Sequence, residues 1–145
     1  MSKIRTILQL QEHLDEEFSW RIKELANLQL SLKSKPDIFK TLIRAGIPLT
    51  YAHWEGFIKK ASIGYLDYVN NQRHKYVELS PCFIVFGLKK KLNEFSQSRK
   101  SRLNIEIIEF LSSELNNRAQ LQIDTAINTE SNLSSEVFEN LILIF

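Results

Sequence analysis

The segment Tyr51–Phe57 places a histidine, a tryptophan and a glutamate at consecutive positions, His53, Trp54 and Glu55. Histidine transfers protons near neutral pH, and a carboxylate can act as an acid or a base. Arg44 lies upstream in the same segment, and an arginine can stabilise the negative charge that develops on a reacting phosphate. His53, Glu55 and Arg44 are therefore the candidate catalytic residues.

The helix that carries these residues decides whether they can act together. At about 100° per residue, Arg44 and Glu55 lie on nearly the same line, whereas His53 lies about 200° from Glu55. A His53–Glu55 dyad within one helix is thus excluded, and any partner of His53 must come from another helix or another chain. Two interpretations stay open. Either both residues form hydrogen bonds across helices at the edge of the core, or His53 acts as an acid/base or RNA-contacting residue.

The apolar residues of the same helix recur at a helical spacing and form a stripe about 100° wide. This pattern predicts that the stripe faces the core and that Trp54 is its anchor. The residues of the predicted core stripe are Ile43, Ile47, Tyr51, Trp54, Ile58, Ala61 and Tyr65.

Helical periodicity extends along most of the chain, and few glycines or prolines interrupt it. The sequence predicts an all-α antiparallel bundle of about four to five helices in a single domain, residues 1–145. Pro48 predicts a kink in the second helix, because it removes one backbone hydrogen bond. The predicted helices are Ile4–Leu32, Pro36 to about Asn70, one that begins after the N-cap Ser80, one at 102–115, and one from Ser135, with a polar loop over 116–135.

Composition narrows the class of protein. The 145 residues are 43% hydrophobic and 25% charged, which is typical of a soluble globular domain. The single cysteine, Cys82, excludes an intramolecular disulfide and a cysteine-based metal site, and His13 and His74 stand alone. We therefore expect no metal and no cofactor. No apolar run is long enough to span a membrane, so a cytoplasmic protein is expected.

A cluster of positive charges begins in the lysine-rich end of the third predicted helix and continues beyond it. Its only acid is Glu94, so the cluster could neutralise phosphates, although a solvated surface would have the same composition. The candidate RNA-binding residues are Lys89, Lys90, Lys91, Arg99, Lys100 and Arg102.

The central block, with Arg44, the Tyr51–Phe57 sequence YAHWEGF and Lys59, resembles the HEPN superfamily in its prokaryotic MAE-type branch. Shorter pieces agree in order: FSWRIKEL from Phe18, FGLKKKL from Phe86, and INTESNLSSEVFENL from Ile127. The resemblance implies an all-α bundle, frequently dimeric, and many members are metal-independent RNases of toxin–antitoxin or other defence systems. These RNases use an arginine and a histidine spaced as Arg-x(4–6)-His on a late helix.

That catalytic spacing is absent from this sequence. The arginines that precede a histidine are spaced differently: Arg5 to His13, Arg44 to His53, and Arg73 to His74. We therefore expect a C-terminally truncated or non-catalytic member that acts as an interaction or dimerisation module, with a metal-independent RNase as the alternative. The expected partners are a second copy of the chain, RNA, and a cognate antitoxin or defence protein, with no membrane.

Overall fold

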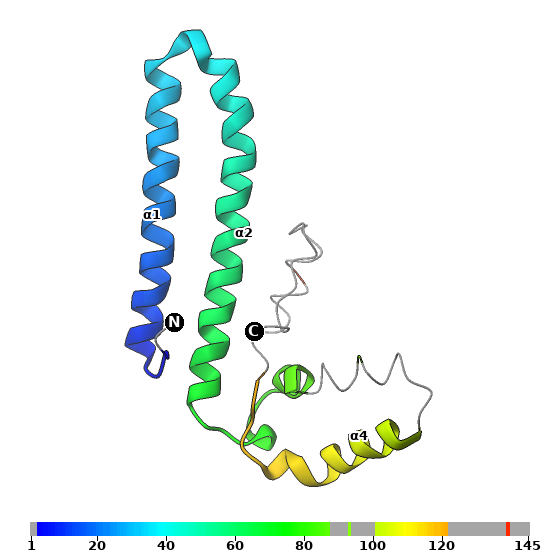
Figure 1. The fold of residues 1–145 in the computed structure, drawn as a ribbon. Helices are drawn as coiled ribbons and strands as arrows, with labels where there is room; N and C mark the ends of the chain where they lie inside the picture. The colour runs from blue at the N-terminus through cyan, green and yellow to red at the C-terminus, as the bar shows by residue number, and fades with distance from the viewer. Residues whose placement is uncertain (1–2, 88–92, 94–100, 122–138, 140–145) are drawn as a thin grey trace.

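The computed structural model describes residues 3–87, 93, 101–121 and 139. The all-α fold class is confirmed, because the described residues form helices and contain no strand, only one isolated bridge. Two long helices, α1 and α2, run antiparallel as a hairpin, and the shorter elements lie near the end of α2 (Figure 1).

Helix α1 spans Ile7–Ser34 and begins three residues later than predicted. Thr6 forms a capping box: its hydroxyl accepts the backbone N–H of Gln9 at 3.1 Å, and the Gln9 side chain accepts the backbone N–H of Thr6. Ile4 lies before the helix, where its N–H donates to Asp67 Oδ2 at 2.7 Å. The segment before α1 is thereby fastened to α2.

Helix α2 spans Phe39–Asn71 and follows a short 3₁₀ turn, η1, at Pro36–Ile38. Pro48 lies inside α2, so the proline does not break the helix, as the sequence predicted. Two residues further on, the Thr50 hydroxyl donates to the Gly46 carbonyl at 2.8 Å, which is an arrangement that favours bending.

Glycines let the two long helices approach each other closely. A Cβ added at Gly64 would lie 2.6 Å from His13 Cδ2, and one added at Gly46 would lie 2.8 Å from Leu28 Cδ2. Both distances are shorter than van der Waals contact. Gly46, His53 and Gly64 are buried, so the face of α2 that packs on α1 runs through these residues.

The main apolar cluster lies at the far end of α2, where several short elements meet it. These elements are η2 (Tyr76–Glu78), a helical segment at 81–87, η3 (Glu114–Asn116) and the extended arm at 117–121 that follows it. Helix α4 (Ser101–Ser113) precedes η3. Leu66 is completely buried in this cluster. The other buried members are Val69, Tyr76, Phe83, Phe86, Ala119 and Leu121.

The predicted core stripe of α2 is only partly buried, and the prediction for Trp54 is wrong. Ile58 and Tyr65 pack against the apolar cluster. Ile43, Ile47 and Trp54 are 39%, 68% and 37% exposed within the described residues. Two faces of α2 could pack against other helices. The face with Gly46, His53 and Gly64 lies against α1, and the face with Trp54 does not.

Several predictions fall outside the described residues: most of the polar loop at 116–135, the last helix from Ser135, and part of the helix after Ser80. No helix in the described part of the chain combines the length and apolarity that a membrane crossing requires.

Candidate functional site

His53 lies between the two long helices and not on an open surface. It is 7% exposed, and its Nε2 lies 3.0 Å from Glu24 Oε2 of α1. This contact has ion-pair distance but does not meet hydrogen-bonding geometry. The Trp20 ring meets the imidazole edge to face, with ring centroids 5.2 Å apart. The partner of His53 therefore comes from another helix, which is the interpretation that sequence geometry required.

Arg21 is the second buried polar residue of this interface. Its guanidinium is paired with Glu17 Oε2 at 2.6 Å and also donates to the Glu17 carbonyl, while its Cζ lies 4.3 Å from the centroid of the Trp20 ring. A Cβ added at Gly56 would lie 3.2 Å from Arg21 Nη2. The guanidinium thus lies against the backbone of α2, in a space that a glycine leaves open.

The ionisation of Glu17 is set by this arrangement. Burial raises the pKa of Glu17, but the hydrogen bond and charge of Arg21, with Lys60 and His13 nearby, lower it by more. The net result is a pKa below the ordinary value of 4.5. A carboxyl group with a lowered pKa stabilises the folded state above its ordinary pKa and loses that contribution as the pH falls through the folded-state value.

We expect the wild-type protein to lose stability below about pH 4.5 more steeply than Glu17→Gln, which has no carboxyl group to protonate. Urea unfolding at a series of pH values measures this difference. Glu109→Gln is the matched control, because Glu109 is an exposed glutamate of α4. If the free energy of unfolding falls equally with pH in the wild type and in Glu17→Gln, the ion pair between Glu17 and Arg21 does not stabilise the fold.

The three candidate catalytic residues do not occupy one environment. His53 is buried against α1, Glu55 is half-buried, and Arg44 is exposed. The carboxylate that meets His53 belongs to Glu24, which the sequence analysis did not single out. The described residues contain no group of three or more histidine, cysteine, aspartate or glutamate side chains that could hold a metal ion.

Most candidate RNA-binding residues lie outside the described part of the chain: Lys89, Lys90, Lys91, Arg99 and Lys100. Arg102 is described, is exposed on α4, and pairs with Glu106 at 3.6 Å. Its surroundings are those of a solvated helix surface.

A continuous apolar groove runs along the hairpin. It consists of two hollows of ≈ 550 Å³ and ≈ 250 Å³, which share Thr50 and Trp54. On α1 its wall is formed by Phe18, Ile22, Leu25, Leu28 and Leu32. On α2 its wall is formed by Leu42, Ile43, Ile47, Thr50, Tyr51, Trp54 and Phe57, with Gly46 at its base and with Arg21 and His53 beside the smaller hollow.

The spacing of the groove residues is that of a helix seam. On α1, Phe18, Leu25 and Leu32 are seven residues apart, and on α2, Ile43, Thr50 and Phe57 are also seven residues apart. A seven-residue repeat places side chains on one side of a helix for packing against further helices. Phe18 and Ile22 are 50% and 46% exposed, so large apolar surface remains uncovered within the described residues.

Comparison with known proteins supplies the family. A family model described as MAE_28990-like HEPN matches residues 10–145. Neither the comparison with curated proteins nor the comparison with solved structures found a match. The matched residues include α1 from residue 10 onward, the whole of α2 and the central block that carries His53.

Proposed function

The chain belongs to the MAE_28990-like HEPN family, and on that premise we propose that it acts as a non-catalytic interaction module that forms a homodimer. The observation that carries this proposal is the apolar groove between α1 and α2, where Ile47 is 68% exposed and Trp54 is 37% exposed. Contiguous exposed apolar surface of this kind marks protein interaction sites. A cytoplasmic role in a prokaryotic defence or toxin–antitoxin system, with a cognate protein partner, fits the family resemblance.

The proposed occupant of the groove is a second copy of the chain. A two-fold axis would place the groove of one copy against the groove of the other. Two-fold symmetry is the commonest arrangement of soluble dimers. Four helices, two from each hairpin, would then surround one apolar seam, as in four-helix bundles. The seven-residue spacing on both walls suits that packing.

The burial of the candidate catalytic residue supports a non-catalytic role. His53 is 7% exposed and is covered by Trp20 and Glu24. A general acid or base must come within hydrogen-bond reach of its substrate. The imidazole borders the smaller hollow of the groove, but its Nε2 lies against Glu24 of α1 and not in solvent.

Light scattering coupled to size-exclusion chromatography tests the dimer. We expect a mass of about 34 kDa, twice the 17.0 kDa of one chain. A mass of 17.0 kDa at every concentration would contradict the proposal.

The alternative is a metal-independent RNase. The observation that favours it is that an arginine and a histidine, Arg21 and His53, line the same hollow of the groove. Incubation of the purified protein with tRNA in the presence of EDTA tests this alternative. Cleavage that His53→Ala abolishes, while Glu55→Ala retains it, would establish the RNase and overturn the non-catalytic role.

A further inference from the structure

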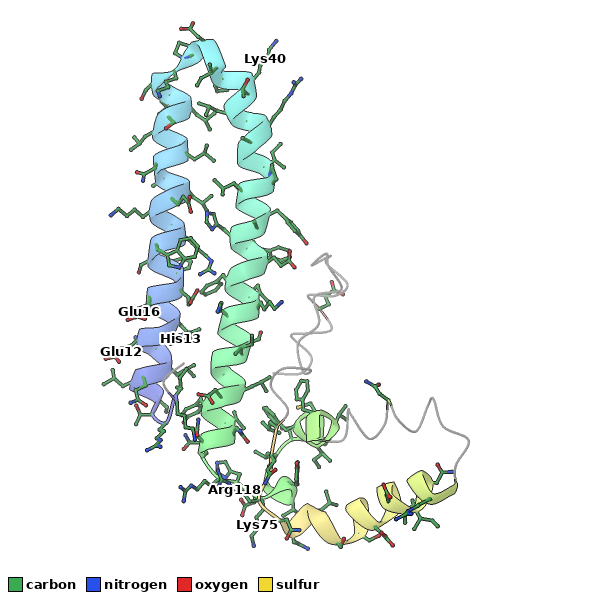
Figure 2. All side chains as sticks on the ribbon, in the orientation of Figure 1. Glu12, His13, Glu16, Lys40, Lys75 and Arg118 are labelled. Atoms are coloured by element: carbon green, nitrogen blue, oxygen red, sulfur yellow. The ribbon has the colours of Figure 1, made fainter. Side chains whose placement is uncertain are left out.

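Lys75 and Arg118 are brought together by the fold although 43 positions separate them in the sequence. They form an isolated antiparallel bridge at the end of the hairpin (Figure 2). The bridge is closed by two hydrogen bonds, from Ala119 N to the His74 carbonyl at 2.9 Å and from Tyr76 N to the Asn117 carbonyl at 3.2 Å. These bonds flank the Lys75–Arg118 pair, so the two residues face each other as a non-hydrogen-bonded pair.

In such a pair the two side chains project from the same face and lie closer together than in the hydrogen-bonded type. Both residues are exposed, and neither side chain forms an ion pair with any other residue that the structure describes. Like charges directly opposite each other destabilise a bridge. The fold therefore holds two positive charges side by side.

Hydrogen bonds and buried side chains hold the residues next to the bridge against the core. The buried Tyr76 hydroxyl donates to the Gln120 carbonyl at 3.1 Å and accepts the Gln120 N–H at 3.0 Å. Leu121 N donates to Asn70 Oδ1 at 3.2 Å, and Leu121 is buried in the apolar cluster. The charged pair consequently lies on an arm that is fixed to the core.

A third cation, Arg73, lies two residues before the bridge and has a backbone conformation that is unusual for a side chain with a Cβ. Its φ is 61°, and the preceding Gln72 is right-handed at φ −72° and ψ −13°. Arg73 follows the C-cap of α2, where the Gln72 N–H donates to the Val69 carbonyl at 3.1 Å, so its left-handed backbone ends the helix and places a cation beside the helix C-terminus.

The nearby titratable groups leave this surface positive. The Glu78 carboxylate accepts the Lys75 N–H at 2.9 Å and lies 3.5 Å from His74 Nδ1. The hydrogen bond from Lys75 comes first among the causes that lower the pKa of Glu78, and the charges of His74 and Lys75 lower it further. One carboxylate therefore lies beside three cations, Lys75, Arg118 and Arg73. Arg5 is close by, because its carbonyl accepts the Gln72 side chain at 2.9 Å.

We propose that Lys75, Arg118 and Arg73 form a binding site for a phosphate group, separate from the apolar groove and independent of dimerisation. Paired cations on a fixed support suit an oxyanion with several acceptor oxygens. Two sources share this chemistry: a small free phosphate compound, and the phosphodiester backbone of a nucleic acid. Contacts to a backbone would be independent of base sequence.

Binding measurements with two ligands test the site and identify the source. A fluorescein-labelled single-stranded oligonucleotide is titrated by fluorescence anisotropy, and inorganic pyrophosphate is titrated by calorimetry. The test variant is Lys75→Gln/Arg118→Gln. The control is Lys33→Gln/Lys40→Gln, which removes the same charge at the opposite end of the hairpin, where Lys40 lies (Figure 2).

We expect the Lys75→Gln/Arg118→Gln variant to bind at least about tenfold more weakly than wild type, and the control variant to bind like wild type. If the ligand is a nucleic-acid backbone, the slope of log affinity against log salt should also fall by about two. Binding of pyrophosphate alone with the same dependence would identify a small phosphate compound.

The melting temperature separates a binding role from a structural one. Removal of two facing like charges should leave the melting temperature unchanged or raise it. If neither ligand binds to the wild type, if both double variants lose affinity equally, or if the test variant melts at a lower temperature, the site is overturned. These outcomes do not depend on the oligomeric state, so they are distinguishable from a failure of the proposed dimer.

Discussion

Replacing Ile47 with glutamate is expected to weaken self-association by about a hundredfold or more, because a central contact in a protein interface contributes several kcal/mol. Ile47 lies in the wall of the groove and is 68% exposed in the single chain. A carboxylate at this position would be buried without a partner in the dimer but solvated in the monomer. Sedimentation velocity over a range of concentrations measures the change.

Ala45→Glu is the matched control. Ala45 is exposed on the same helix, does not line the groove, and receives the same new charge. We expect Ala45→Glu to remain dimeric and both variants to keep the helical circular dichroism of the wild type. An Ile47→Glu protein that associates like wild type would exclude the groove as the dimer interface. Unfolding by Ile47→Glu would indicate that the groove is filled from within one chain.

Replacing Leu66 with alanine is expected to lower the free energy of unfolding by about 2–5 kcal/mol. Leu66 is completely buried, and it joins α2 to the helical segment at 81–87 and to the arm at 117–121. Truncation therefore removes apolar contacts and leaves a cavity where these segments meet. Urea unfolding monitored by circular dichroism measures the loss.

Val77→Ala is the control for Leu66→Ala, because Val77 is 59% exposed in η2 beside the same cluster. Its expected cost is within about 0.5 kcal/mol, as for most surface substitutions. Equal losses for the two variants would show that the apolar cluster is not centred on Leu66. If Val77→Ala also binds phosphate like the wild type, η2 tolerates a local change without loss of the proposed phosphate site.

Helix periodicity was enough to predict the all-α class and the two long helices, because amphipathic spacing and caps are local features. The face of α2 was harder to predict. Apolar residues are clustered around Trp54, whereas the face that packs on α1 contains Gly46, His53 and Gly64. Close helix packing favours small residues such as glycine. A hydrophobicity scale does not count glycine as apolar, so the apolar pattern did not mark this face. The glycine spacing was the signal that could have corrected the prediction.

The environment of His53 could be predicted only in part. Its angular separation from Glu55 excluded an internal dyad, and the structure supplies Glu24 and Trp20 from α1 in place of Glu55. No local pattern identifies which residues of a second helix will lie opposite, because the register of the hairpin depends on its turn at η1 and on packing. The Lys75–Arg118 bridge depends on contacts across 43 positions and was invisible in the sequence for the same reason.

The most direct test of the groove as a dimer interface is an isotope-filtered nuclear Overhauser measurement on a mixture of labelled and unlabelled chains. We predict contacts from the Trp54 indole and the Ile47 methyl groups of one copy to α1 or α2 of the other copy. If these protons show contacts only within their own chain, for example to residues 137–145, the groove is covered from inside and the proposed dimer is contradicted.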